Sequence, residues 1–436
     1  MKFYDRTEEL EILKKNWEQS SRHSMMTTLI GRRRTGKTSL LLKSVEGTKF
    51  LYLYVSKDNE QLLCKKFQEQ ASASLGLAIY GQTLSFAELF TELMRFGAEH
   101  HYTLIIDEFQ NFLSINKAIP SVIQDIWDRY KDTTRVNLIL CGSIYSMMKK
   151  MFENGDEPLY GRRDSNMRLQ PFTIATLKQI LKDHHPGYAA DDLLCLYMLT
   201  GGVAKYVALL MDAKAVTKTR MLKYALSPDS PLLTEGTELM LSEFGRDYGT
   251  YFSILQLIAG GMTTQSEIDS VIGKNTGAYL GNLCEDYTFI SRNLPMLSKI
   301  GNRNINWQID DPFLRFWFRF IYPHQGLIES NQLALLHQHV SDSYTQFTGK
   351  TLEHYFHNLY MQTGRYTRIG NWWDRKGENE LDMVALNEFD KQAVIAEIKR
   401  NSKKLDLAEL QRKASALPSD FASYRIELKL LSLEEM

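Results

Sequence analysis

Cysteine is scarce in this 436-residue chain, and Cys64, Cys141, Cys195 and Cys284 form no CxxC pair or Cys/His cluster. Their wide spacing argues against disulfides and structural zinc and favours a reducing compartment, so we expect a cytoplasmic protein. No apolar run approaches the roughly 20 residues that a membrane-spanning helix needs. The N-terminus is charged and amphipathic, unlike a signal peptide. We therefore expect no membrane partner.

Net charge is absent too, because Lys+Arg and Asp+Glu both number 52. The balance excludes a general electrostatic attraction to nucleic acid, so any such contact needs a local basic patch. Hydrophobic residues make up 44% and charged residues 24%, values typical of a globular chain. The length favours two or three domains over a single core.

The sequence GRRRTGKT, residues 31–38, has the GxxxxGK[ST] spacing of a loop that binds phosphates. An apolar strand (27–30) precedes it and a helical stretch follows, which is the context that this motif requires. Lys37 would reach the β- and γ-phosphates of a nucleotide, and the Thr38 hydroxyl would help to hold Mg²⁺. The central arginines occupy variable positions and are interpreted first as a solvated basic loop. The residues expected to bind the nucleotide here are Gly31, Arg34, Thr35, Gly36, Lys37, Thr38 and Ser39.

A second apolar strand (101–108) ends in adjacent carboxylates. Asp107 at its tip would coordinate Mg²⁺, and Glu108 would polarise the attacking water. The alternative, a buried strand whose charges mark only where it emerges, is weaker because a phosphate loop lies upstream. A further strand (135–143) ends in Ser143, which could contact the γ-phosphate or the water.

Two more strands are expected, over 49–55 and 167–172. Strands that alternate with helical stretches predict an α/β fold with a parallel sheet, covered by helices on both faces. Ligands bind such sheets at the carboxyl ends of the strands, where all three motifs lie. We assign residues 1–172 to this P-loop core.

Several segments together resemble the prokaryotic P-loop ATPases, abundant in archaea, of the AAA+/STAND-related class. They are FYDRTEEL (3–10), IDEFQ (106–110), CGS (141–143), LYGR (159–162) and TGGVAKY (200–206). The resemblance implies an ATPase that uses ATP and Mg²⁺, with the first segment, including Arg6, beside the adenine. It makes Arg162 a candidate γ-phosphate sensor, in its own subunit or a neighbouring one, with a plain surface charge as the alternative. Ala204 replaces the usual proline, so nucleotide sensing at that turn is in doubt.

The same resemblance implies a small helical lid over residues 173–240. Helices and turns over 251–292 suggest a winged helix, which we place within 241–325. Its recognition helix has little positive charge, since Lys274 stands near Glu285 and Asp286. A protein contact is therefore favoured over DNA binding. The aromatic residues of 313–320 recur at helical spacing, which favours packed core over base stacking.

A separate domain is expected over 340–436, with the chain restarting near 346–350 and a helix over 351–362. Two apolar segments then form a hairpin in which Asp382 precedes a Glu397-x-Lys399 strand. The order resembles the PD-(D/E)xK core of restriction-endonuclease-like folds. It implies that Asp382 and Glu397 hold Mg²⁺ or Mn²⁺, that Lys399 stabilises developing charge, and that Glu353 orients water or Lys399. A degenerate fold kept for docking is the alternative.

Positive charge and tryptophan gather in this domain and could form a groove that follows a phosphate backbone, with a solvated face and core tryptophans as the alternative. Two functions follow, with a nucleotide-driven motor that acts without cleavage as a third possibility. The first is an ATPase whose nucleotide state controls a nuclease-like, DNA-binding domain. The second is an ATP-dependent regulatory switch that recruits a protein partner or assembles with itself. The residues of the expected groove are Arg365, Arg368, Trp372, Trp373, Arg375, Lys376, Lys399, Arg400, Lys403 and Lys404.

Overall fold

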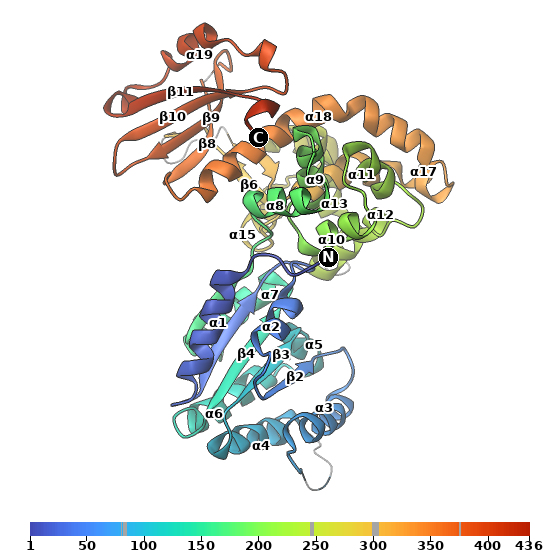
Figure 1. Ribbon diagram of the computed structural model, residues 1–436, viewed down its shortest axis with the longest axis vertical. Coiled ribbons are helices and arrows are strands. Elements are labelled where there is room, and N and C mark those ends of the chain that lie inside the picture. The colour runs from blue at the N-terminus through green and yellow to red at the C-terminus, as the bar shows by residue number, and fades with distance from the viewer. Residues whose placement is uncertain (80, 82–84, 245–247, 299–304, 375) are drawn as a thin grey trace. The chain divides into compact units, whose positions relative to one another are not determined.

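The computed structural model describes residues 1–436 except 80, 82–84, 245–247, 299–304 and 375 (Figure 1). The chain divides into two units, each described by itself. The first unit is Asp5–Pro171, and the second unit joins Met1–Tyr4 to Phe172–Met436. Within the described residues, no helix is both long and apolar enough to cross a bilayer.

The first unit is built on a parallel sheet with the strand order β2-β3-β4-β1-β5. Every residue of β1, β3 and β4 is buried, as expected for strands with helices on both faces. The α/β fold with a parallel sheet is thus confirmed. The strands are β1 (Met25–Ile30), β2 (Phe50–Tyr54), β3 (Tyr102–Asp107), β4 (Val136–Gly142) and β5 (Ser165–Arg168).

The expected fifth strand was wrong in its bounds, because β5 ends at Arg168 rather than continuing to residue 172. The Leu169 N–H still donates to the Ile30 carbonyl, but Pro171 has no N–H to donate, so the strand does not continue to residue 172. The two helices that begin at Glu60 and Phe86 are capped by side chains: Asn59 accepts from the Leu62 N–H and Ser85 from the Glu88 N–H. The helices of this unit are α1 (Thr7–Gln19), α2 (Lys37–Ser44), α3 (Glu60–Leu75), α4 (Phe86–Glu99), α5 (Phe112–Ile115), α6 (Ile119–Tyr130) and α7 (Tyr145–Glu153).

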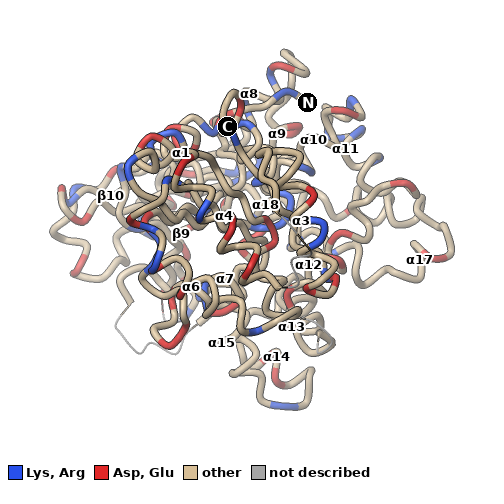
Figure 2. The backbone as a smooth tube through the Cα atoms, turned by 90° about the horizontal axis from the view of Figure 1, so that it is seen from below, with Lys and Arg blue, Asp and Glu red and all other residues tan. Residues whose placement is uncertain are grey.

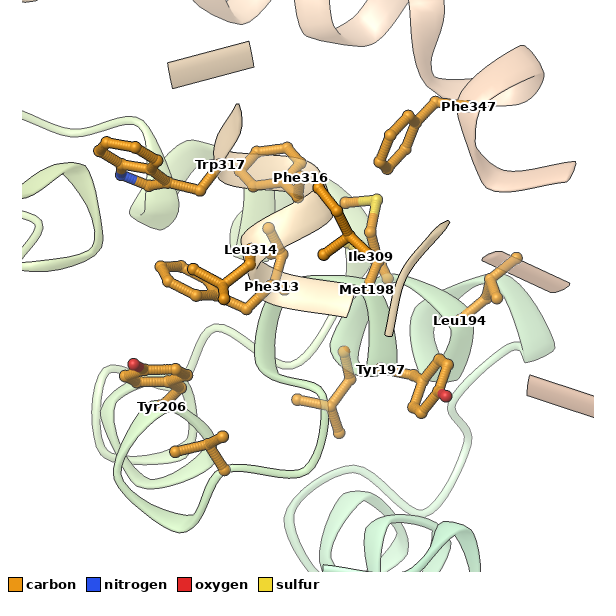
Figure 3. Packing of buried hydrophobic residues seen from close by; sticks show 14 of the residues in the cluster. Leu194, Tyr197, Met198, Tyr206, Ile309, Phe313, Leu314, Phe316, Trp317 and Phe347 are labelled. Carbon is orange, nitrogen blue, oxygen red and sulfur yellow. The ribbon is translucent and has the colours of Figure 1, made fainter. Parts of the chain in front are cut away.

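The second unit begins with a helical region whose core is aromatic and aliphatic. Phe313, Phe316 and Trp317 are fully buried, as expected for packed core, and the Phe313 ring lies against Tyr206 (Figure 3). The Trp317 indole N–H donates to the Leu233 carbonyl, which satisfies its polar atom inside the core. The helices are α8 (Ile174–His184), α9 (Ala190–Thr200), α10 (Ala204–Asp212), α11 (Lys218–Ala225), α12 (Leu232–Phe244) and α16 (Pro312–Phe316).

Between α12 and α16 lies a group of short helices and a two-stranded antiparallel pair. The elements are α13 (Gly249–Gly260), α14 (Gln265–Ile272), α15 (Gly277–Glu285), β6 (Ile290–Asn293) and β7 (Asn306–Ile309). Three helices followed by a two-stranded antiparallel pair are consistent with a winged helix, which stays a prediction.

The C-terminal part carries a sheet with the order β11-β10-β9-β8, in which β10 and β11 are parallel and the other neighbours are antiparallel. The expected restart near residues 346–350 was wrong, because α18 runs without a break through this segment. The domain boundary placed at 340 falls inside this helix. The domain bounds stay a prediction. The elements are α17 (Gln325–Glu329), α18 (Leu333–Gln362), β8 (Arg368–Trp373), β9 (Glu380–Asn387), β10 (Gln392–Ile398), α19 (Leu407–Ala414) and β11 (Arg425–Leu431).

Candidate functional site

The phosphate loop joins the end of β1 to the start of α2. Gly36 has φ 96°, a left-handed conformation that side chains rarely adopt, and it leads directly into the helix. A Cβ on Gly31 would lie 2.8 Å from the Leu169 carbonyl oxygen, so this position also requires glycine. The loop amides and the helix N-terminus therefore form a concave, positively polarised end suited to phosphate.

Lys37 is buried and folds back over this loop. Its Nζ donates to the Gly31 carbonyl at 2.7 Å and to the Arg32 carbonyl at 3.0 Å. Thr35 is buried beside it, while Thr38 and Ser39 are exposed at the start of α2. The ammonium group is thus held at the loop where an incoming phosphate would offer it stronger acceptors.

The expected magnesium ligands meet at the end of β3. The Thr38 hydroxyl donates to Asp107 Oδ2 at 3.1 Å, across 69 residues of sequence. The Tyr52 hydroxyl donates to the same oxygen at 2.6 Å. Hydroxyl and carboxylate oxygens are ligands that Mg²⁺ prefers, so the residues fit this ion.

Tyr52 was missed by sequence reasoning, because an aromatic residue in a strand gave no signal beyond core packing. Burial raises the pKa of its phenol, and the hydrogen bond to Asp107 adds to the rise. The phenol therefore stays protonated and can only donate to Asp107, which fixes that carboxylate beside Thr38.

Glu108, at the end of β3, lies next to Ser143, which follows β4. The Ser143 hydroxyl donates to Glu108 Oε2 at 2.7 Å, and the Gln110 amide donates to the same oxygen. Glu108 itself has φ 55°, which turns the chain out of the strand. Gln110 was not singled out, although it belongs to the IDEFQ segment. Its Oε1 is buried without a hydrogen-bond partner in the described structure, and it could accept from a water at Glu108.

The two candidate arginines outside the loop have different surroundings. Arg6 is buried, pairs with Glu9 at 3.0 Å, and its guanidinium is 3.4 Å from the Thr35 carbonyl, so it lies against the phosphate loop. Arg162 instead pairs with Asp128 at 2.9 Å, just before β5 enters the sheet. Asp128 lies near the end of α6, which leads into β4, so this edge is opposite the phosphate loop. The placement contradicts a γ-phosphate contact in its own subunit, and the role toward a neighbouring subunit stays a prediction.

The candidate residues of the C-terminal site come together at the open end of the β9–β10 hairpin, away from its turn. Lys399 Nζ lies 3.0 Å from both Asp382 Oδ2 and Glu397 Oε1, and both carboxylates are buried. The Ile398 N–H also donates to Asp382 at 2.8 Å. The negative charges raise the pKa of Lys399 against the opposing effect of its partial burial. The ammonium group is therefore fixed as a cation between the two carboxylates.

Lys413 of α19 is a further member that the sequence did not reveal. Its Nζ lies 3.1 Å from both oxygens of Glu397. No spacing rule links a helix lysine to the preceding strand, so only the fold could identify it. Among the described residues, no group of three metal-ligating side chains forms. Mg²⁺ commonly binds through one or two carboxylates and water, so Asp382 and Glu397 are the type and number of ligands that this ion needs.

Glu353 does not reach Lys399. It pairs instead with Lys350 at 2.9 Å, one turn earlier on α18. Burial raises its pKa to about 7, while Lys350 opposes the rise. The carboxyl thus lies near the balance between its neutral and charged forms at neutral pH.

The residues expected to form a basic groove do not all face solvent. Arg400 is not a groove residue, because its guanidinium pairs with Asp191 at 2.8 Å, and Trp372 is packed in the core. Basic and acidic residues are interspersed over the backbone (Figure 2). Arg365, Lys376, Lys403 and Lys404 are exposed, and Arg375 lies outside the described residues.

Residues 3–210 match a family described as an ATPase domain predominantly from Archaea, and residues 317–412 match archaeal and bacterial proteins of unknown function. An uncharacterised protein of Methanocaldococcus jannaschii is 31% identical over 421 residues, which cover 94% of this chain and 90% of that protein.

Two solved structures share the fold. A Walker-type ATPase of Pyrococcus abyssi matches with a TM-score of 0.55 and 20% identity, over 72% of this chain and 96% of that chain. The ORC2 protein of Aeropyrum pernix, solved as ADPNP and ADP complexes, matches with a TM-score of 0.52 and 16% identity, over 76% of this chain and 96% of that chain.

Proposed function

Because the chain belongs to this largely archaeal family, in which an ATPase domain precedes a domain of unknown function, we propose that its Mg²⁺-dependent ATP hydrolysis controls a nuclease-like C-terminal site. The observation that carries the ATPase part is the meeting of Thr38 with Asp107 beside the pair of Ser143 with Glu108. Metal ligands and a water-polarising carboxylate then stand at one edge of the sheet, next to the phosphate loop.

Each residue of the nucleotide site has a distinct task in hydrolysis. Lys37 exchanges its two loop carbonyls for phosphate oxygens. Glu108, oriented by Ser143 and Gln110, holds a water for attack on the γ-phosphate. Magnesium at Thr38 and Asp107 would supply positive charge to the β- and γ-phosphate oxygens. Arg6, beside Thr35, would support the loop near the base.

The C-terminal part of the proposal is supported by the cluster of Asp382, Glu397 and Lys399. Its strand order, with an antiparallel hairpin, a helix and a parallel return strand, is the order that the PD-(D/E)xK resemblance calls for. Two carboxylates could hold Mg²⁺ or Mn²⁺, and Lys399 could stabilise charge on a phosphate under attack. DNA is the substrate class that this chemistry favours.

A specific observation favours the second candidate, a regulatory switch whose C-terminal part docks a partner. Lys399 and Lys413 together neutralise Asp382 and Glu397, as a structural ion cluster would. In that function, ATP changes the assembly state, and the partner is a protein or a second copy of the chain.

Cleavage of labelled linear and branched DNA, with Mg²⁺ or Mn²⁺ and with or without ATP, separates the two functions. Wild type is compared with Lys37→Ala and Asp382→Ala, and the matched controls are Lys43→Ala and Asp390→Ala, which change exposed residues of the same types. We expect Asp382→Ala to abolish cleavage and Lys37→Ala to remove its dependence on ATP. Intact ATP hydrolysis with no cleavage in any lane would refute the nuclease and favour the switch.

A further inference from the structure

A cavity of about 480 Å³ lies in the second unit, between the α13–β7 region and the surface formed by α18 and β8. Its size falls within the range of about 300–1,000 Å³ typical of small-molecule sites. The wall is part aromatic and part polar. The residues on which the argument depends are Trp307, Arg315, Lys350, His354, Asn371 and Trp373.

Arg315 is the charged group in this wall that lacks a counter-ion. Its guanidinium lies over the Phe347 ring at 4.7 Å, and it has no hydrogen bond or ion pair with any residue that the structure describes. Glu353 attracts it from beyond ion-pair distance but is already paired with Lys350. Burial lowers the pKa of Arg315 to about 10, so the guanidinium remains charged at neutral pH.

Arg315 is only partly exposed, and a charge withdrawn from water without a partner is costly. An anion bound in the cavity would supply the missing counter-ion. The neighbouring charges leave little room for a highly charged ligand, since Lys350 is balanced by Glu353 at 2.9 Å and Glu380 at 3.6 Å. His354 is held neutral, because burial and then the nearby Arg315 charge lower its pKa well below the usual value. The cavity therefore suits a group with one or two negative charges.

The rest of the wall indicates what carries that charge. Trp307 is buried in the core and the Arg292 guanidinium lies 5.6 Å from its ring centroid. Trp373 is half-buried and lines the cavity, so its ring is the flat apolar surface on which a nucleic-acid base can stack. The planar fork of an arginine matches phosphate oxygens in pairs. An anion joined to a flat ring system is the chemistry of a nucleotide.

The cavity wall is also tied to the C-terminal carboxylate site. The Asn371 amide and the His357 ring both lie 2.8 Å from the backbone oxygen of Asp382, each as a donor. Glu353 of the same wall is close enough to Asp382 for their charges to interact. A nucleotide in the cavity would thus stand directly beside the strand that carries Asp382.

We propose that this cavity binds one nucleotide unit, with its phosphate on Arg315 and its base against Trp373. The inference rests on the proposed nucleic-acid role of the C-terminal site and names its substrate as a strand end that carries a phosphate. A free mononucleotide shares this chemistry, and the test distinguishes the two sources.

The probe is octathymidylate labelled with fluorescein at its 3′ end, prepared with either a 5′-phosphate or a 5′-hydroxyl. Fluorescence anisotropy of the full chain is measured in EDTA, so that neither cleavage nor ATP hydrolysis takes part. We expect the 5′-phosphate to strengthen binding by about tenfold or more, and Arg315→Met to remove that gain. Arg319→Met, which changes an exposed arginine in the same segment, should bind as wild type does.

Competition with thymidine 5′-monophosphate shows which ligand the cavity prefers. If the mononucleotide displaces the probe at concentrations similar to those at which the oligonucleotide binds, the ligand is a free nucleotide. If far higher concentrations are needed, the ligand is a strand end. Equal binding of the two oligonucleotides, or an unchanged gain in Arg315→Met, overturns the proposal.

Thermal unfolding tests whether Arg315→Met is correctly folded, because loss of an unpaired charge should leave its melting temperature unchanged or higher. A marked fall would assign Arg315 a packing role on Phe347 and also overturn the proposal. DNA cleavage that persists without phosphate-dependent binding would reject this site alone, leaving the proposed function standing.

Discussion

Replacing Arg400 with methionine removes the cation that joins the end of β10 to helix α9. Its guanidinium donates to Asp191 Oδ1 at 2.8 Å and to the Thr348 hydroxyl at 2.7 Å. The Arg400 and Asp191 side chains are only 15% and 21% exposed, so water screens the pair weakly. Lys218 at 2.7 Å and the Tyr344 hydroxyl at 3.1 Å also contact Asp191.

The expected loss follows from these contacts. Removing one partner of a buried pair costs about 3–5 kcal/mol where the other charge is left alone. Here Lys218 and Tyr344 still satisfy Asp191, so we expect about 2 kcal/mol. For a unit of this size, that loss lowers the melting temperature by about 4–8 °C.

The loss should also depend on pH. Burial alone would raise the pKa of Asp191, but hydrogen bonds from Lys218 and Arg400 outweigh it and lower the pKa. A carboxyl with a lowered folded-state pKa stabilises the fold above its unfolded value of about 3.9, and the contribution disappears as the pH falls through the folded value. The difference between wild type and Arg400→Met should therefore be constant near neutral pH and shrink below about pH 4.

Thermal unfolding followed by tryptophan fluorescence measures this, since Trp307, Trp317, Trp372 and Trp373 all lie in the second unit. Arg425→Met, which changes an exposed arginine at the start of β11, is the matched control and should shift the transition little. The double variant with Asp191→Asn should show a coupling of about 1–2 kcal/mol. Additive effects, or equal losses in Arg400→Met and Arg425→Met, would refute the assigned contact.

Three further predictions test single side chains. Tyr52→Phe leaves the Asp107 carboxylate less fixed, so Mg²⁺ affinity in the ATP complex should fall by about threefold to tenfold with metal-free ATP binding unchanged, measured by calorimetry. Lys413→Met removes a cation from Glu397 and should strengthen Mn²⁺ binding to the nucleotide-free protein by about tenfold or less, measured by paramagnetic resonance titration. Weaker binding would mean that Lys413 positions Glu397 for the metal. Glu353→Gln should raise the melting temperature at pH 8 but not near pH 4. The pKa of Glu353 rises to about 7 on folding, so its ionisation destabilises the folded protein as the pH increases from 4 to 8, and glutamine cannot ionise.

The local parts of the fold were predictable because their signals are local. Buried parallel strands appear in the sequence as apolar runs. Gly36 adopts a left-handed backbone conformation, and at Gly31 there is no room for a Cβ. The pairing of Thr38 with Asp107 also followed, since all the parallel strands of one sheet have their carboxyl ends at the same edge. The hairpin that joins Asp382 to Glu397 had the same kind of signal.

Other features depend on packing that a linear pattern does not record. Tyr52 looks like any aromatic strand residue until its hydroxyl meets Asp107. Lys413 looks like a solvated helix residue until α19 returns across the sheet to Glu397. The start of α18 lay well before the expected residue, because polar residues in its first half hide a helix whose buried face is long.

Arg400 shows what such misreading conceals. Its position directly after Lys399 placed it in a basic groove, yet its partner is Asp191, 209 residues earlier in the chain. Arg400 and Lys399 are consecutive on one backbone, and Lys399 contacts both Asp382 and Glu397. A displacement of α9 must therefore either break the Asp191 pair, at the cost expected above, or move the backbone that carries Lys399. The ion pair is thus a physical link through which a change at α9 would reach the carboxylate site.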